Sequence, residues 1–537
     1  MDEALRPAAS PACGQALRPW TVAAVLILLA WNGFQAWRMT LPMRQGHDAF
    51  ISRQIGRTGL NHRILAVQTT RLANVTAIRQ DGGLVLHRSY GPMASWVVAL
   101  SMATGLPYDP SVRLPVLVSM NLFLIGTGLL AWRLGGSRAS LAAMIVAALV
   151  PVVLFRYSLL CVFENLGLGP FMLAVGIGLR PESRKRSIAV GSLATLAVLF
   201  SWVFLAVLVP WLVSDAVRRR QAGSASLVLA TMAVPLAVYL ATLQAVTGDC
   251  LGDVRSFLGH VGERSSWSTL RANDTTVLTP ALMVRLNSVR LIRNLGRIPV
   301  VGAVLSLVVH ARRRRLDALL WCLGLLGMAL PMNFTPNLAY LHDFFVILYV
   351  PAIALGCGLL AGRIAQRFPE RVARRVVLGG LAAFVVVDVI PAARIVGPRP
   401  EDARQDAIAR ELGQRIGPRD LVIADPSVCS YEPEHFQVGD GNREWPPLPF
   451  YAGRICQTVL VARTPEEAIR LARAAERGTG RAVFVVNCGA TPWELPEGFS
   501  RCLPASPVAG FQLWQDSTVR AAAKAGGRGT SPATVRR

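Results

Sequence analysis

Acidic side chains are scarce in this 537-residue sequence, which has 32 Asp and Glu against 56 Lys and Arg and a formal net charge of +24. Charged residues of both signs make up 16% of the chain, whereas hydrophobic residues make up 53% and the mean hydropathy is +0.42. Soluble domains rarely sustain such a composition. The sequence therefore excludes an ordinary soluble protein and predicts a polytopic α-helical membrane protein.

Signatures of nucleotide binding and of hydrolysis are absent. The chain has no Walker loop, dinucleotide fingerprint, HExxH motif or nucleophile elbow, and no CxxC or Cys/His pattern with metal spacing. We therefore expect no nucleotide cofactor and no metal site built from such a motif. A high positive charge often indicates nucleic-acid binding, but here much of the arginine flanks apolar segments, where membrane orientation and anionic lipids account for it.

Eleven apolar segments are candidates for membrane-spanning helices, which need about 20 residues each. The first, from Trp20 to Trp37, lacks a small-residue cleavage site and predicts an uncleaved span behind a cytoplasmic N-terminus, residues 1–18. The membrane domain extends over residues 19–395, with spans at residues 19–37, 113–132, 139–156, 160–179, 187–201, 202–217, 225–247, 297–310, 316–332, 343–362 and 376–395.

Short arginine clusters separate these segments at alternate gaps. The clusters are Arg133 with Arg138, and residues 180–186, 218–220, 312–315 and 363–375. Basic residues beside a span resist translocation, so each cluster fixes its loop in the cytoplasm. The remaining gaps and the C-terminal part then lie on the outer side, which is periplasmic if the membrane is the bacterial inner (plasma) membrane.

Residues 38–112 form the first outer loop. Apolar residues recur at helical spacing among arginines from Phe50 to Val75, which predicts basic amphipathic helices on the membrane surface. The apolar stretch 92–106 is too short to span, and we interpret it as a helix lying in the interface. Residues 38–88 carry eight arginines against only Asp48 and Asp81, an excess that indicates an anionic ligand.

The composition changes after Ile395. Residues 421–424, 458–462 and 482–486 are typical of buried strands, a capped helix begins at Thr464, and residues 401–416 alternate in charge like a solvated helix. We predict a small α/β domain outside the membrane, residues 396–522, and a disordered basic tail, residues 523–537. The α/β domain contains four cysteines: Cys429, Cys456, Cys488 and Cys502. In an oxidising compartment they form up to two disulfides, with three possible pairings, or they stay unpaired.

Two outer carboxylates are candidates for catalysis. Asp48 follows His47 beyond the first span, where an ionised carboxylate can take a proton from a hydroxyl, although an Asp there also caps a helix beginning at Ala49. Glu164 lies at the outer end of an apolar segment, which indicates function unless it snorkels to the interface or pairs with Arg156. The two acids could share a proton, hold a divalent cation, or divide the roles of base and orienting group.

Further candidates are substrate-binding residues. Arg88 and Tyr90 precede the interfacial helix, and a guanidinium binds phosphate oxygens in pairs, whether of a ligand or of ordinary lipids. His342 and Asp343 open the tenth span, where they bind phosphate or hydrogen-bond to each other. Arg156 and His47 complete the predicted binding set.

This layout resembles that of the GT-C membrane glycosyltransferases, close to the protein O-mannosyltransferases and the bacterial aminoarabinose and Rgt-type transferases. Over most of residues 19–395, His47-Asp48 stands where the family has its first acidic motif and Glu164 at the second acidic position. Tyr90-Gly91-Pro92 with Thr104-Gly105-Leu106 resembles the interfacial segment, and residues 337–343 with Tyr349-Val-Pro351 resemble the late helix motif. The chain departs from the family in its single first carboxylate, in having no Lys before Pro92, and in His342-Asp343 where Arg-Tyr is usual.

The resemblance implies transfer of a sugar from a polyprenyl-phosphate donor to an acceptor hydroxyl of a glycan, lipid or protein, with inversion. It implies Asp48 as general base, Arg88 offsetting charge on the lipid phosphate, and Glu164 orienting hydroxyls. Two other classes stay open. A transporter or flippase of lipid-linked saccharides should have charges near the mid-plane and broken helices in matching halves; a non-catalytic envelope scaffold needs neither acid.

Overall fold

The structure is a computed structural model. It describes residues 17–41, 47–78, 84–86, 91–180, 183–219, 222–265, 267, 277–336, 344–394, 407–408, 411–417, 420–425, 444–445, 459–479, 482–487, 492–502 and 512–516. The chain forms two compact units. The first, the helical unit, comprises Met1–Thr40, Val116–Leu236 and Thr279–Gly397, and the second comprises Leu41–Pro115, Ala237–Leu278 and Pro398–Arg537. The predicted N-terminal segment up to residue 16 and the predicted tail 523–537 lie outside the described residues.

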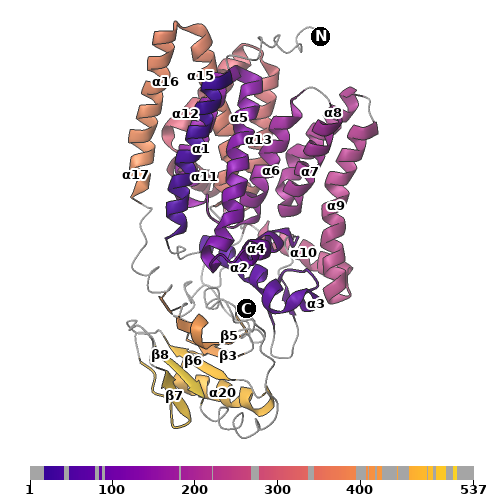
Figure 1. Cartoon of the computed structure of the whole chain (residues 1–537), viewed down its shortest axis with the longest axis vertical. Coiled ribbons are helices and arrows are strands. Elements are labelled where there is room, and N and C mark those ends of the chain that lie inside the picture. The colour runs from indigo at the N-terminus through magenta and orange to yellow at the C-terminus, as the bar shows by residue number, and fades with distance from the viewer. Residues whose placement is uncertain are drawn as a thin grey trace. The chain divides into compact units, whose positions relative to one another are not determined.

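Helices of the first unit run side by side (Figure 1). A helix lies at each of the eleven segments predicted to span. The elements are α1 (Leu17–Met39), α5 (Tyr108–Leu149), η2 (Val152–Arg156), α6 (Phe163–Gly178), α7 (Arg184–Phe200), η3 (Trp202–Phe204), α8 (Leu205–Arg219), α9 (Ala222–Thr247), α11 (Pro280–Leu295), α12 (Arg297–Arg312), α13 (Leu316–Phe334), η4 (Phe344–Tyr349), α15 (Val350–Arg367), α16 (Glu370–Phe384), η5 (Val385–Val389) and α17 (Ile390–Ala393).

Fewer helices than eleven have the length and composition of a membrane span. Among the described residues six qualify, or seven if the bent pair α11–α12 is one span. Three of the predicted spans fall short because α6, α7 and α8 have only 16, 17 and 15 residues. Two more merge because α5 counts as a single helix of 42 residues. Several apolar helices are nevertheless present, as in a multi-pass membrane protein.

The long helix α5 is in fact two antiparallel arms. Gly136 interrupts it with φ 83° and ψ −174°, a conformation that a residue with a Cβ adopts only at a cost. A Cβ on Gly128 would lie 2.6 Å from Sδ of Met144. In a straight helix these positions would be about 24 Å apart, so the chain must reverse between them. The reversal separates the predicted spans 113–132 and 139–156 at the Arg133/Arg138 cluster.

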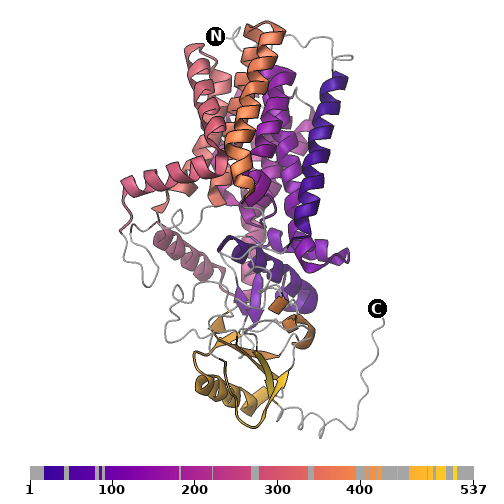
Figure 2. The ribbon, with the colours of Figure 1, turned by 90° about the vertical axis from the view of Figure 1, so that its left-hand side faces the viewer.

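A sharp bend joins α11 to α12. The two helices meet at 107° across Gly296, which has φ 90° (Figure 2). Asp388 of η5 reaches the start of α12, where its Oδ1 and Oδ2 accept hydrogen bonds from the backbone N–H groups of Arg297 (2.9 Å) and Ile298 (3.0 Å). A carboxylate is favoured at a helix N-terminus because it satisfies free N–H groups and complements the helix dipole. This acid inside an apolar segment therefore has a structural role.

Replacing Gly296 by Ala should destabilise the helical unit. The substitution puts a side chain at positive φ and a Cβ 2.8 Å from the Asp388 carboxylate, which together should cost about 2–4 kcal/mol. We expect a lower midpoint of thermal unfolding in detergent. Gly327→Ala is the matched control, since a Cβ at this α13 position meets nothing within 4 Å and should leave the midpoint unchanged or raise it. Equal midpoints for the two variants would contradict the proposed constraint.

Residues 41–115 of the second unit pack helices around a small hairpin. Helix α2 (His47–Ile64) lies against α4 (Met93–Ala103), and α3 (Ala66–Thr70) leads to strands β1 (Val75–Ile78) and β2 (Leu84–Leu86). The prediction of helices from Phe50 to Val75 is wrong at its C-terminal end, where Val75 begins strand β1. Leu72 has φ 62° and Val75 is paired in the hairpin with Leu86, because the chain leaves the helix after α3.

The C-terminal part of the second unit contains a six-stranded sheet in the order β4-β5-β3-β6-β8-β7. Strands β3 (Leu421–Ala424), β5 (Val459–Val461) and β6 (Val483–Asn487) are parallel, and β4 (Glu444–Trp445), β7 (Phe499–Cys502) and β8 (Gln512–Asp516) are antiparallel additions. Successive residues of β3 and β6 face opposite sides. One face packs on Ala468 and Ala472 of α20 (Pro465–Thr479).

The prediction of a solvated helix at residues 401–416 is wrong in that one side of this segment is buried. Residues 407–408 and 411–415 are helical, but Ile408, Leu412 and Ile416 are fully buried against the other face of the sheet. Their spacing of four residues forms an apolar stripe among the charges, which the alternating charge pattern obscured. The sheet is therefore covered on both faces.

Cysteine pairing is also partly corrected. Cys502 of β7 is a free thiol. Cys429, Cys456 and Cys488 lie outside the described residues. Of the four cysteines, at most one pair can then form a disulfide, fewer than the two that the sequence allowed.

Candidate functional site

The predicted site residues divide into those that the structure describes and those that it does not. Residues His47 and Asp48 form the first turn of α2, and their side chains lie outside the described part of the chain. Four further predicted residues lie entirely outside the described part of the chain: Arg88, Tyr90, His342 and Asp343. The structure describes Arg156 and Glu164, and it brings them together with residues that the sequence did not single out.

Glu164 is buried at the first turn of α6, with 1% of its surface exposed. The hydroxyl of Ser201 donates a hydrogen bond of 3.3 Å to its Oε1. Ser201 has extended backbone angles at the break between α7 and η3, and from there its hydroxyl reaches the carboxylate on α6. The carboxylate is further favoured by its place at a helix N-terminus. A buried acid held in this way can accept hydrogen bonds from the hydroxyls of a bound molecule.

Asn165 shapes the loop before α6. Its Nδ2 donates to the carbonyls of Tyr157 (2.7 Å) and Leu160 (2.8 Å), while its own carbonyl accepts from the Ser119 hydroxyl (2.6 Å). The side-chain Oδ1 of Asn165 is buried and has no hydrogen-bond partner among the described residues. An unpaired buried acceptor costs free energy, so this oxygen is available to a donor next to Glu164.

Arg156 ends the π-helical turn η2, a conformation that is frequent at functional sites. Its guanidinium donates to Oδ1 of the buried Asn294 in α11 and lies 5.4 Å from the centre of the Tyr157 ring. Asn294 is thus a hydrogen-bond partner of Arg156 that the sequence did not indicate.

Arg38, at the end of α1, holds η2 in place. Its guanidinium donates to the carbonyls of Leu154 (2.8 Å) and Phe155 (2.6 Å) and to the hydroxyl of Ser158 (2.8 Å). A π-helical turn leaves carbonyls with poor internal partners, and a charged donor satisfies them. Helix α1 therefore fixes the turn that carries Arg156.

In the second unit, α2 carries two buried cations. Arg53 and Arg57 are 4% and 2% exposed and lie one turn apart on the same face of the helix. Each side chain carries a guanidinium group. They concentrate positive charge on the helix that begins with His47 and Asp48.

A polar network joins α2, α3 and α4 around His62. Ser95 Oγ lies within hydrogen-bond distance of Asn74 Oδ1 (2.8 Å) and of His62 Nε2 (3.0 Å), and His62 Nδ1 lies 2.9 Å from the Thr70 hydroxyl. Asn74 in turn donates to the carbonyl of Gly91 (3.2 Å), directly after the predicted binding residue Tyr90. Burial lowers the pKa of His62 from 6.5 to about 4. Burial therefore favours the neutral imidazole in this network.

This part of the protein should become less stable as the pH falls. The unfolded chain binds a proton below pH 6.5 and the folded chain only near pH 4, so stability is complete above pH 6.5 and is lost below it. Between pH 7 and pH 5 the loss should be about 2 kcal/mol. Hydrogen exchange of α2 and α4 backbone amides measures it, and His62→Gln should remove this pH dependence. An equal dependence in the variant would assign it to other groups.

Within the part of the chain that the structure describes, no three His, Cys, Asp or Glu residues come together as a potential metal site.

Comparison with solved structures gives the fold. ArnT, the aminoarabinose transferase of Cupriavidus metallidurans, bound to undecaprenyl phosphate, superposes with a TM-score of 0.56 at 15% identity, over 94% of this chain and 99% of ArnT. Its apo state gives 0.52 at 14% identity over the same shares. The chain has a GT-C fold. A weaker likeness, with a TM-score of 0.48 and 13% identity over 87% of this chain and 69% of the other, is to the archaeal oligosaccharyltransferase AglB from Archaeoglobus fulgidus in complex with an inhibitory peptide and a dolichol-phosphate.

The GT-C fold was predicted from the sequence, whereas no family model matches the chain and no curated protein matches its sequence. The predicted resemblance is confirmed at the level of the fold. Within that fold, sequence reasoning missed Ser201, Asn165 and Asn294. One signal was present for Ser201, a polar residue at the junction of two short apolar segments. Asn165 and Asn294 had no such signal because amides are common beside apolar helices.

Proposed function

We propose that this protein is a membrane glycosyltransferase that moves a sugar from a polyprenyl-phosphate donor to an acceptor hydroxyl of a glycan, lipid or protein. The observation that carries the proposal is the likeness over nearly the whole length of both chains to ArnT bound to undecaprenyl phosphate. The buried Glu164 supports it, because an ionisable group is costly in an apolar helix and its carboxylate can accept hydrogen bonds from substrate hydroxyls.

The reaction takes place on the outer face of a bacterial inner membrane, with eleven spans in residues 19–395 and residues 396–522 as a periplasmic domain. The alternating arginine clusters support this orientation. The sheet of the C-terminal part, covered on both faces, supports its assignment as a separate α/β domain.

Each predicted residue has a role in an inverting transfer. Asp48 takes the proton of the acceptor hydroxyl as its oxygen attacks the anomeric carbon, and the bond to the lipid phosphate breaks with its electrons going to the phosphate oxygen. Arg88 offsets the charge that develops there, helped by outer arginines such as Arg53 and Arg57. Glu164 orients sugar or acceptor hydroxyls through hydrogen bonds to its carboxylate.

The remaining predicted residues position the substrates. Arg156 is held against Asn294, and in this proposal its remaining donors contact the donor phosphate or sugar. We assign Tyr90 to substrate binding; the next residue along the chain, Gly91, accepts a hydrogen bond from Asn74. We assign His47, His342 and Asp343 to binding near the phosphate, in keeping with their places in the motifs.

The test is release of free polyprenyl phosphate by the purified full-length protein in detergent, supplied with polyprenyl-phosphate sugars and a panel of hydroxyl acceptors. We expect release that depends on both donor and acceptor and yields a glycosylated product. In proteoliposomes, a flippase would instead move the intact labelled donor between leaflets without cleaving it. That result would replace the proposed function, and a scaffold would give neither signal.

A further inference from the structure

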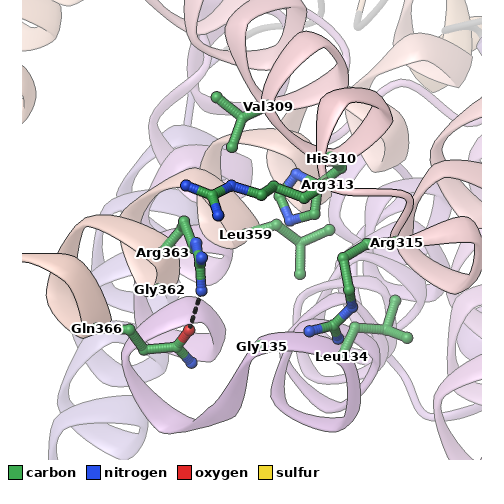
Figure 3. A pocket seen from close by; sticks show the side chains of 10 residues that line it. All are labelled: Leu134, Gly135, Val309, His310, Arg313, Arg315, Leu359, Gly362, Arg363 and Gln366. Atoms are coloured by element: carbon green, nitrogen blue, oxygen red, sulfur yellow. Dashed lines mark hydrogen bonds between the residues drawn. The ribbon is translucent and has the colours of Figure 1, made fainter. Parts of the chain in front are cut away.

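A second basic site lies in the helical unit, apart from Glu164 and Arg156. The ends of α12 and α15 and the end of the first arm of α5 enclose a cavity of about 180 Å³ (Figure 3). Its walls combine apolar and glycine positions with a polar group of side chains: His310, Arg313, Arg315, Arg363 and Gln366. Among the described residues, none that lines it is acidic.

The arginines come from two segments that are distant in sequence. Arg313 and Arg315 belong to the turn between α12 and α13, and Arg363 belongs to α15. Figure 3 shows these guanidinium groups around Leu359, with the His310 ring beside Arg313. Arg363 is half-buried, while Arg313 and Arg315 are exposed, so the cavity can be reached from outside the bundle.

Their positive charge is only partly balanced. Arg315 forms an ion pair of 3.4 Å with Asp317, and Arg363 donates to the neutral Gln366 Oε1 at 3.2 Å. Within the described part of the chain, the guanidinium of Arg313 has no hydrogen-bond or ion-pair partner. Two guanidinium groups without a carboxylate therefore share one cavity, which favours an anion between them.

The turn itself is shaped to present these side chains. Arg314 has φ 52°, a left-handed conformation that is unfavourable for a residue with a Cβ. The reversal is closed by hydrogen bonds from Arg315 N to the His310 carbonyl (3.0 Å) and from Arg314 N to the Ala311 carbonyl (3.1 Å). It leaves Arg313 and Arg315, the two neighbours of Arg314, lining the cavity. Such strain persists where the surrounding structure requires a particular geometry.

The size of the cavity selects among anions. Sites for drug-sized molecules and cofactors usually have about 300–1,000 Å³. A cavity of about 180 Å³ is too small for a nucleotide but has room for a phosphate group with a short polar substituent. Basic pockets between membrane helices bind the head groups of anionic lipids in this way.

Arginines that only orient the chain in the membrane have no need to converge on one cavity. Arg371 and Arg374 of α16 belong to the same cluster, are exposed, and line no part of this cavity. Their charge is enough to orient the chain, whereas the arginines at the cavity also lie close together. We propose that Arg313 and Arg363, with His310 and Gln366, form a phosphate-binding pocket that takes either an anionic phospholipid head group or free phosphate.

The experiment compares phosphate ligands on the purified full-length protein. Native mass spectrometry counts bound phosphatidylglycerol against phosphatidylcholine, and titration calorimetry measures inorganic phosphate and pyrophosphate. The test variant is Arg313→Gln/Arg363→Gln, and Arg371→Gln/Arg374→Gln is the control with the same loss of charge. We expect at least about tenfold weaker binding in the test variant, with binding in the control unchanged.

Two outcomes support the pocket and distinguish its ligand. Selective loss of phosphatidylglycerol, with no binding of free phosphate, identifies a lipid head group. Selective loss of phosphate or pyrophosphate binding identifies a soluble anion. Equal loss in both double variants, or no difference of either from the wild type, overturns the proposal and leaves a non-specific basic surface. Thermal unfolding of each variant shows that it is folded.

Discussion

Asp48→Asn should lower sugar transfer by a factor of about 10² to 10⁴ while leaving the protein folded. This is the range that a positioned general base contributes. The amide cannot accept the proton that leaves the acceptor hydroxyl as the new glycosidic bond forms. The measurement is acceptor-dependent release of free polyprenyl phosphate from the purified variant, normalised to the wild type.

The choice of Asn separates catalysis from capping. Helix α2 begins at His47 and not at Ala49 as predicted, so Asp48 lies inside its first turn. Asn stabilises a helix start about as well as Asp, so an Asp48 with a purely structural role should tolerate the change. Asp249 provides the matched control, because its Oδ1 accepts from Gly252 N at 2.9 Å at the start of α10 (Cys250–Arg264) in the same unit. Asp249→Asn should keep full activity. If Asp48→Asn also keeps it, Asp48 only stabilises the start of α2 and the base lies elsewhere.

Glu164→Gln should lower transfer by about 10²-fold, the scale of a substrate displaced by about 1 Å from its reactive position. Gln keeps the size of Glu and an oxygen that accepts from Ser201, but it removes the negative charge that we propose orients substrate hydroxyls. The midpoint of thermal unfolding should stay the same or rise, because removing a buried charge also removes its desolvation cost. Activity and unfolding are measured on the same preparation.

Ser201→Ala is the companion variant. It leaves the carboxylate in place and removes one donor to it, so we expect a smaller loss, of about tenfold. A structural role for the pair makes the opposite prediction, in which both variants lower the unfolding midpoint and neither changes the activity of the folded protein. Wild-type activity in Glu164→Gln would remove this acid from the proposed mechanism.

The helices were accessible to sequence reasoning because apolar runs and arginine clusters mark them directly. Helix α15 is an example, with an apolar run that ends at Arg363. The number of spans was harder to predict, since hydropathy alone shows neither the reversal at Gly136 nor how short α6, α7 and α8 are. Strands β7 and β8 were missed because Phe499–Cys502 and Gln512–Asp516 have no long apolar run.

The site was predictable only in part. An acid in an apolar segment is visible in a sequence, and Glu164 was found for that reason. The same signal also marks Asp388, which caps α12, so the signal alone does not separate function from structure. The partners Ser201 and Asn294 come from elements distant in sequence, and only tertiary packing brings them to Glu164 and Arg156.

The reversal inside α5 has a consequence for biogenesis. Its arms meet at Gly136 without an intervening loop, so we expect them to be integrated into the membrane together as a helical hairpin. Epitope tags for mapping topology therefore belong at longer connections, because an insertion at this turn would separate the two arms.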